Sequence, residues 1–169
     1  AGADEILDEM QARSMTVLRI WAFQDLVEQS GCLQCAPNRQ LGPSERPIDF
    51  IDTATLIALD QTLAAADARG IRVVLTLVNN WDDYGGMNRY SVWRFGSRHH
   101  DGFYTDPIIR GWFKDYITLL VNRVNTVNGR TYRDDPTIFS WQLANEARSG
   151  WASSKALNTW IGEMSAHIK

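Results

Sequence analysis

Three short apolar runs alternate with segments of helical periodicity, and this alternation constrains the fold more than any other feature of the chain. The apolar runs cover residues 16–23, 71–78 and 138–144. Apolar side chains recur on one face in the segments 3–14, 53–69, 106–128 and 153–168. The resulting order, α-β-α-β-α-β-α, predicts an α/β fold with a parallel sheet and right-handed crossovers.

Polar residues accompany all three predicted strands. Arg19 interrupts the first strand, Asn79-Asn80-Trp81-Asp82-Asp83 follows the second, and Asn145-Glu146 ends the third. A doubly wound sheet usually carries a glycine-rich loop after its first strand, but this chain has Ala22-Phe23-Gln24-Asp25 there. Polar residues at several strand ends are instead typical of an α/β barrel, which needs eight strands and about 250 residues. We therefore predict that residues 1–169 form a single domain that is part of a (β/α)8 TIM barrel.

Composition excludes two classes of partner. The formal net charge is −3 and the basic residues form no stripe, so a nucleic-acid partner is not expected. No apolar run approaches the ~20 residues that span a bilayer, so a membrane-spanning protein is not expected either. The seven tryptophans suit a sugar-binding surface, since sugar rings have apolar C–H faces, although tryptophan is also a common core residue.

Glu146 is the candidate catalytic residue. It is the only glutamate of the chain at the carboxyl end of a predicted strand, where α/β proteins place their reactive groups. Asn145, directly before it, is a candidate for positioning a substrate. The alternative is structural: Glu146 would cap the following loop, and Asn145 would form a turn at the strand end.

Residues 24–51 and 79–104 are predicted to be long loops. The first contains Cys32-Leu-Gln-Cys35, which has redox-motif spacing but lies in a Pro- and Gly-rich segment. We expect a local disulfide, which would suit a secreted protein, with two free thiols as the alternative. The second contains His99 and His100, which lack a third ligand nearby, so we expect a solvated pair and no metal site.

Several motifs, in order, resemble the endo-β-1,4-mannanases of glycoside hydrolase family 5. They are Arg19-Ile-Trp-Ala-Phe23, Val78-Asn-Asn-Trp-Asp-Asp-Tyr-Gly-Gly86, Tyr132-Arg-Asp-Asp-Pro-Thr-Ile138 and Trp141-Gln-Leu-Ala-Asn-Glu146. The resemblance implies retaining hydrolysis on a (β/α)8 barrel, with the three strands here as barrel strands 2, 3 and 4. It also implies that the family nucleophile, a glutamate after strand 7, and the remainder of the barrel lie outside this sequence. No cofactor is implied.

The resemblance assigns a role to individual residues. It implies that Glu146 is the acid/base, that Asn145 binds the 2-hydroxyl of the cleaved sugar, and that Arg19 orients the nucleophile. Trp81, and more weakly Trp21, resemble aromatic residues of the cleft; the alternative for both is packing at the top of the barrel. Ala147 departs from the family pattern, which has proline there.

We therefore predict a secreted, extracellular endo-β-1,4-mannanase that acts on β-mannan polysaccharide or manno-oligosaccharides. Residues 1–169 alone are expected to lack activity, because the nucleophile is absent. Two alternatives remain: another family 5 activity such as an endo-β-1,4-glucanase, and a carbohydrate-binding fragment without catalysis.

Overall fold

The protein is described by a computed structural model that covers residues 2–29 and 31–169; Ser30, inside the predicted loop 24–51, lies outside the described residues. The regular elements, in chain order, are α1 (Ala3–Ala12), β1 (Val17–Trp21), η1 (Pro47–Phe50), α2 (Thr53–Ala68), β2 (Arg72–Thr76), α3 (Gly86–Phe95), α4 (Gly102–Thr105), α5 (Pro107–Val121), η2 (Tyr132–Asp134), β3 (Ile138–Gln142) and α6 (Ser154–Ile168). None of the helices in these residues is long and apolar enough to cross a membrane.

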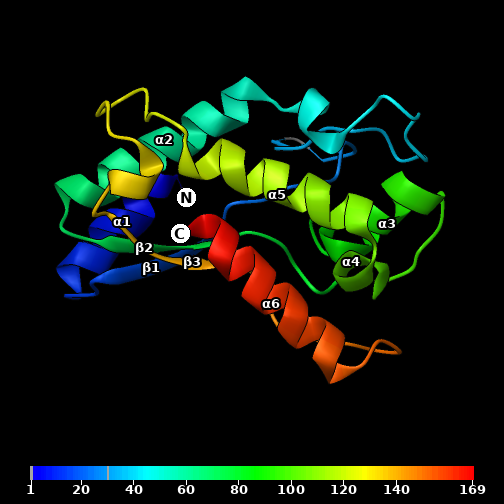
Figure 1. Cartoon of the computed structure of the whole chain (residues 1–169). Coiled ribbons are helices and arrows are strands. Elements are labelled where there is room, and N and C mark those ends of the chain that lie inside the picture. Colours follow the sequence, from blue (N-terminus) through cyan, green and yellow to red (C-terminus); the bar gives the residue numbers. More distant parts are fainter. Residues whose placement is uncertain (1, 30) are drawn as a thin grey trace.

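The three strands form one parallel sheet in the order β1-β2-β3. Val17 pairs with Arg72 and Trp21 with Thr76, while the β2–β3 register is shifted by an irregularity between Val73 and Val74. Strands alternate with helices along the chain, as the apolar pattern predicts (Figure 1). All three strands are shorter than expected, because their last predicted residues already turn into the loops that carry the polar side chains.

Helices cover one face of the sheet. This face carries Leu18, Ile20, Val73, Leu75, Ile138 and Trp141, all of which belong to or pack against the hydrophobic core. Figure 1 shows α2 and α5 on this side. The opposite face carries the polar residues Arg19, Thr76, Ser140 and Gln142 together with the apolar residues Val17, Trp21 and Val74. Among the described residues the sheet is therefore covered on one face only, although parallel sheets are usually covered on both.

Local signals fix the helix ends. The Asp52 carboxylate accepts hydrogen bonds from the Ala54 and Thr55 amides at the start of α2, and the Asp106 carboxylate does the same for Ile108 and Ile109 in α5. Pro107 occupies the first turn of α5, where no amide partner is required. The Ser153 side chain accepts a bond from the Ala156 amide and starts α6.

Two helices interrupt the predicted loop 79–104. Helix α3 buries Met87, Tyr90 and Trp93 against the core, and α4 buries Phe103 and Tyr104. Sequence reasoning missed both helices. Their polar residues, including Arg89 and Ser91, are also buried, so no clean one-sided stripe is visible in the sequence.

Candidate active site

Glu146 lies directly beyond the carboxyl end of β3. A parallel bridge between Asn79 and Asn145 continues the sheet past the regular strands: the Asn145 amide donates to the Val78 carbonyl at 2.8 Å, and the Asn80 amide donates to the Asn145 carbonyl at 3.1 Å. The next residue, Glu146, has φ +50°, in the left-handed region that non-glycine residues seldom adopt. The backbone thus turns sharply at Glu146, and its side chain leaves the sheet at the strand end.

Trp81 and Arg148 flank the Glu146 carboxylate. The Trp81 indole donates from Nε1 to Glu146 Oε2 at 2.8 Å, and Arg148 Nη2 lies 3.7 Å from the same oxygen. The Arg148 guanidinium also lies over the Trp81 ring, 5.3 Å from its centroid. Both contacts use Oε2, so Oε1 remains available to an incoming group. The Glu146 side chain is 54% exposed. The described residues therefore do not bury it to the extent that is expected of a catalytic acid.

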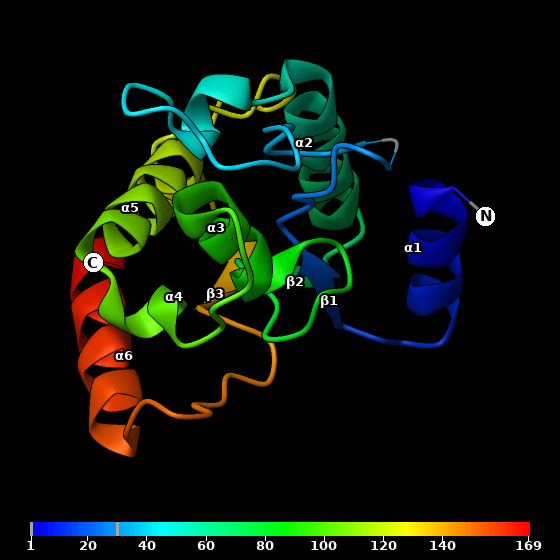
Figure 2. The ribbon, with the colours of Figure 1, turned by 90° about the vertical axis from the view of Figure 1, so that its right-hand side faces the viewer.

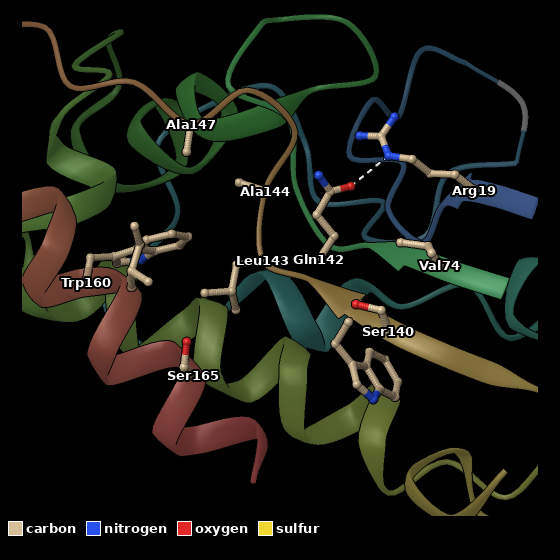
Figure 3. A pocket seen from close by; sticks show the side chains of 11 residues that line it. Arg19, Val74, Ser140, Gln142, Leu143, Ala144, Ala147, Trp160 and Ser165 are labelled. Carbon is tan, nitrogen blue, oxygen red and sulfur yellow. Dashed lines mark hydrogen bonds between the residues drawn. The ribbon is translucent and has the colours of Figure 1, made fainter. Parts of the chain in front are cut away.

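A row of hydrogen-bonded side chains crosses the uncovered face of the sheet beside Glu146. Arg19 donates from Nε to Gln142 Oε1 at 2.7 Å (Figure 3). It also donates from Nη2 to Asn145 Oδ1 at 2.8 Å. Asn145 in turn donates from Nδ2 to Asn79 Oδ1 at 2.9 Å. Each member comes from a different loop or strand, so the row fixes the relative positions of the three strand ends.

Gln142 is the member of this row that sequence reasoning missed. Its Oε1 accepts from both Arg19 and Thr76 Oγ1, the latter at 2.8 Å. It holds the Arg19 guanidinium, which also lies 4.8 Å from the centroid of Trp21. The available signal was that Gln142 is a polar residue within the third predicted strand, two residues before Ala144, and alternation places it on the same face of the sheet as Arg19. Within residues 2–29 and 31–169, Arg19 has no carboxylate partner.

The connection between β3 and α6 is held by residues of the second long loop. Asp101 is fully buried, and its carboxylate accepts hydrogen bonds from the Gly150 and Ala152 amides. The Tyr104 hydroxyl donates to the Arg148 carbonyl at 3.0 Å. These bonds fix the segment that begins at Glu146.

His100 contributes to this support. Its Nδ1 lies 2.7 Å from Asp101 Oδ1, and its Nε2 lies 3.0 Å from Asn80 Oδ1. The Asn80 side-chain oxygen also accepts from the Arg148 amide at 3.0 Å. The expectation of a solvated histidine pair is therefore wrong for His100, whose ring joins two loops. Sequence spacing gives no sign of these partners, because they meet only in the folded chain.

Burial of the Asp101 carboxyl favours its neutral form, but hydrogen bonds from the Gly150 amide, His100 and the Ala152 amide outweigh that effect and lower its pKa. Asp101 is therefore a charged anchor for the segment that follows Glu146.

A hollow of about 570 Å³ adjoins this site on the side of β3 and α6. Figure 3 shows Arg19, Ser140 and Gln142 on its sheet side, Trp160 and Ser165 on its helix side, and Ala147 above. Arg19 and Gln142 are shared between the hollow and the row that leads to Glu146. Glu146 itself does not line the hollow, but Ala144 and Ala147 on either side of it in the chain do.

Comparison with known proteins places this chain in a family. A model of the family described as GH family 5 beta-mannosidase-like matches residues 2–169. The chain belongs to that family. The resemblance seen in the sequence motifs is therefore confirmed.

Three relatives show how much of a family member is present. The chain is 40% identical over 161 residues to "Mannan endo-1,4-beta-mannosidase 2" of Arabidopsis thaliana. The matched region covers 92% of this chain and 34% of the relative. The endo-1,4-beta-mannanase structure from Rhizomucor miehei has a TM-score of 0.85 at 34% identity, covering 99% of this chain and 48% of its own. The endo-beta-1,4-mannanase structure from Thermotoga petrophila has a TM-score of 0.82 at 38% identity, covering 99% and 36%.

The chain thus spans about a third of the length of the curated relatives it matches. The solved structures are family 5 barrels matched over part of their chains, so the predicted fold class, part of a (β/α)8 TIM barrel, is confirmed.

The structure brings most of the predicted site residues of this family 5 chain together. Glu146 and Trp81 are hydrogen-bonded, and Arg19 and Asn145 are hydrogen-bonded beside them. The Trp21 ring lies 4.8 Å from the Arg19 guanidinium and packs against Phe23 at a centroid distance of 5.2 Å. Its position favours a supporting role over direct contact with a substrate.

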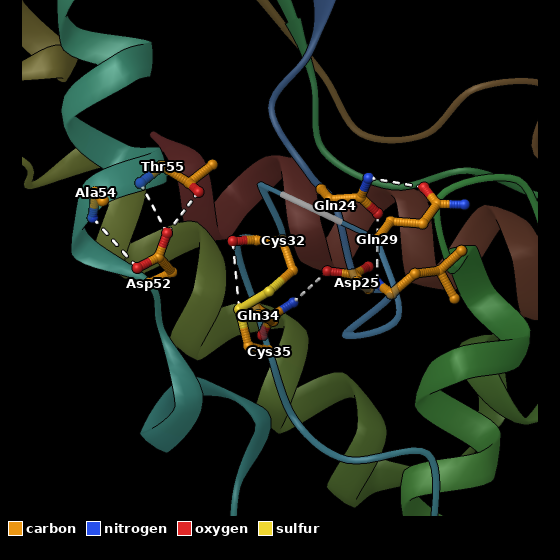
Figure 4. The surroundings of a disulfide bond; sticks show 10 residues. Gln24, Asp25, Gln29, Cys32, Gln34, Cys35, Asp52, Ala54 and Thr55 are labelled. Carbon is orange, nitrogen blue, oxygen red and sulfur yellow. Dashed lines mark hydrogen bonds between the residues drawn. A yellow bond between two sulfur atoms is a disulfide. The ribbon is translucent and has the colours of Figure 1, made fainter.

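Cys32 and Cys35 are joined by a disulfide in the loop between β1 and α2 (Figure 4). The Cys35 amide donates to the Phe50 carbonyl and the Asp52 amide to the Leu33 carbonyl, so the loop is tied to the start of α2. No group of three or more histidine, cysteine or acidic residues in the described part of the chain could hold a metal ion.

Proposed function

We propose that the protein carrying this chain is an endo-acting β-1,4-mannanase that cleaves mannan with retention of configuration, and that Glu146 is its acid/base. One observation carries the proposal: the Glu146 carboxylate is oriented by the Trp81 indole at the end of a row of polar side chains that reaches Arg19. The relatives are named mannan endo-1,4-beta-mannosidases, which supports the choice of substrate.

The geometry suggests a division of labour between the two carboxylate oxygens. Trp81 occupies Oε2, so Oε1 is the atom that would give a proton to the leaving glycosidic oxygen and later remove a proton from water. In its protonated state the side chain can keep the Trp81 bond, because Oε2 still accepts. The indole therefore holds the acid in one orientation through both steps.

Arg19 and Asn145 would act on the other partners of the reaction. A retaining enzyme needs a second carboxylate about 5 Å from the acid. The guanidinium of Arg19 keeps N–H groups beyond those given to Gln142 and Asn145, and these would hold such a carboxylate ionised. Asn145 donates one Nδ2 hydrogen to Asn79 and accepts from Arg19 at Oδ1, so its second Nδ2 hydrogen is the group that would bind a sugar hydroxyl.

Replacement of the acid tests this proposal. In the protein that carries this chain, Glu146→Ala should lower hydrolysis of β-1,4-mannan by about 10²- to 10⁴-fold, because general acid–base catalysis contributes that much. An aryl mannoside with a good leaving group needs no protonation, so its first step should be much less affected. Azide, a nucleophile that needs no general base, should then restore turnover by forming a mannosyl azide of retained configuration.

The matched control is Glu9→Gln, an exposed glutamate of α1 paired with Arg13, which should leave hydrolysis unchanged. Full activity of Glu146→Ala would remove Glu146 from the mechanism. Equal activity of the unaltered protein on β-1,4-glucan would favour the glucanase alternative, and binding of mannan without any hydrolysis would favour a carbohydrate-binding fragment.

We also expect the protein to be secreted. The Cys32–Cys35 disulfide supports this, because disulfides persist in oxidising compartments. Antibody detection of the protein in the medium and not in the cells of its source would test it; retention inside the cells would contradict it.

A further inference from the structure

Trp151 is the most exposed tryptophan of the chain. Trp93 and Trp160 are buried, Trp21, Trp112 and Trp141 are partly buried, and only Trp81 and Trp151 are exposed, at 45% and 72%. Both exposed tryptophans lie on connections that follow the carboxyl end of a strand, Trp81 after β2 and Trp151 after β3. Exposure of so much apolar area needs a reason, because burial of a tryptophan is strongly favourable.

The backbone on both sides of Trp151 is fixed by a buried charge. The Asp101 carboxylate, fully buried, accepts hydrogen bonds from the amides of Gly150 and Ala152, the two neighbours of Trp151. The connection between β3 and α6 therefore runs alongside α4 (Figure 2). The exposed ring is carried by a segment that is held in place, so little conformational entropy would be lost when a ligand binds to it.

The Trp151 ring lines a groove of about 430 Å³ at the ends of α3, α4 and α5. The groove is also lined by Phe95, His99, Gly102, Thr105, Asp106 and Pro107. The Phe95 and His99 rings meet edge to face at 5.4 Å. Gly102 lets the Phe95 ring approach, since a Cβ there would lie 3.1 Å from Phe95 Cε2. The groove is therefore a largely aromatic surface with polar groups at its rim.

The charges of the groove are balanced. Asp106 pairs with Arg94 at 3.5 Å, and the Arg94 guanidinium also lies 5.4 Å from the centroid of Phe95. Thr105 donates its hydroxyl proton to the Asp101 carbonyl and keeps lone pairs for a ligand. Aromatic faces beside neutral and paired polar groups fit a neutral, hydroxyl-rich ligand, and they fit a phosphate or an acidic peptide poorly.

We propose that this groove is a second binding surface for the polysaccharide, on which a stretch of β-1,4-mannan chain away from the scissile bond stacks against Trp151. One segment joins the groove to the candidate active site: it leads from Glu146 to Trp151, and its Arg148 lies over the Trp81 ring. This inference rests on the proposed function for the identity of the sugar. It adds that long chains are bound by more residues than the cleft itself provides.

Affinity electrophoresis in gels containing soluble β-1,4-galactomannan tests this proposal, with all proteins carrying Glu146→Gln so that the polymer stays intact. Trp151→Ala should weaken binding of the polymer by about fivefold or more, because truncation of an aromatic anchor commonly costs over 1 kcal/mol. Binding of mannotriose, measured by calorimetry, should stay unchanged. Trp81→Ala, in the cleft, should weaken both.

Val127→Ala is the matched control, since Val127 is 58% exposed and lies between α5 and β3, at the opposite end of the sheet. Circular dichroism melts show whether the variants are folded, and Trp151→Phe should retain part of the binding. Unchanged retardation of Trp151→Ala overturns the proposal while the proposed function stands. A loss of self-association in Trp151→Ala, without a change in retardation, also overturns it and marks a contact between copies.

The two proposals fail in different ways. If galactomannan does not retard the protein but β-glucan does, and this retardation depends on Trp151, the mannanase proposal fails and the groove stands as a polysaccharide-binding surface. If no neutral polysaccharide retards the protein, both fail.

Discussion

Asp25 is a buried carboxyl group without a full set of partners. It belongs to the loop between β1 and α2 and is completely buried, and among the described residues the side-chain bond of its carboxyl group is to Oδ1, from Gln34 Nε2 at 3.1 Å. Burial raises the pKa of Asp25 to about 7, against the opposing effects of the Gln34 bond and the Arg89 charge. Asp25 Oδ2 and Gln34 Oε1 both lack a partner among the described residues. Protonation of Asp25 supplies a hydrogen-bond donor at a place where two acceptors have none.

The contribution of Asp25 to stability should therefore fall as the pH rises from about 4 to about 7. The folded pKa of Asp25 lies above the ordinary value of 3.8, so the folded state binds more protons between these two values. The free energy of unfolding should decrease from about pH 4 to pH 7 and level off above it, by on the order of 4 kcal/mol at most. Urea denaturation at a series of pH values measures this slope.

Asp25→Asn keeps the shape of the side chain and removes the titration. We expect the slope between pH 4 and 7 to shrink and the variant to be more stable than the parent at pH 8. Asp134→Asn, which changes an exposed carboxylate, is the control and should keep the slope. An unaltered slope in Asp25→Asn would show that Asp25 is ionised in the fold throughout this range.

At the scale of elements, one buried carboxylate joins α2 to the connection between α5 and β3. Asp60 is fully buried and accepts hydrogen bonds from Arg123 Nε at 2.8 Å and from Arg123 Nη2, Tyr132 and Thr126 as well. Burial opposes its ionisation, but the bonds from Arg123, Tyr132 and Thr126 outweigh that effect and lower its pKa. This one group therefore ties α2 to the segment that leads into β3.

Asp60→Ala should destabilise the protein by about 3–5 kcal/mol, because it leaves the Arg123 charge partly buried and unpaired. Asp67→Ala is the matched control on the same helix: it breaks the exposed pair with Arg130 and should cost less than about 1 kcal/mol. Thermal and urea unfolding of both variants provide the comparison. Equal losses would mean that Asp60 contributes no more than a surface pair.

Helix α3 begins directly after the loop at the end of β2. Gly86 starts α3 at φ +63°, and a Cβ there would lie 2.1 Å from the Trp81 carbonyl oxygen. The glycine pair thus lets the helix begin directly against the loop that carries Trp81. In the sequence the same glycines, among polar and aromatic residues, are typical of a loop.

At the scale of the whole molecule, the two outer strands leave edges of the sheet unpaired. Among the described residues β1 and β3 each pair with β2 alone, and Phe139 of β3 is 67% exposed while Val17 of β1 is 48% exposed. Unpaired edges with exposed apolar side chains promote association. The single domain over residues 1–169 stays a prediction, and its behaviour in isolation depends on these edges.

Residues 1–169 produced alone should therefore self-associate. Chromatography with light scattering should show a mass above 19.2 kDa that increases with concentration. Phe139→Lys places a charge at one edge and should reduce association, while Ile6→Lys, on exposed α1, should not. A monomer at every concentration would show that the edges are protected in some other way.

The amino-acid sequence by itself determined the type and order of the main elements, because apolar periodicity and capping residues such as Asp52 and Asp106 act locally. It also marked Glu146 and Asn145, since a polar pair after an apolar strand is visible in one dimension. The motifs around Trp81 and Arg19 identified the family on the same grounds.

Only the tertiary structure decided which side chains meet. Gln142 joins Arg19, His100 joins Asn80 to Asp101, and Asp101 holds the segment around Trp151, through pairs separated by up to 123 residues. These contacts depend on the parallel order β1-β2-β3, which brings the carboxyl ends of three strands that are distant in the sequence to the same end of the sheet. Hydrogen bonds between such residues carry no periodic signal, so their partners become known only when the chain is folded.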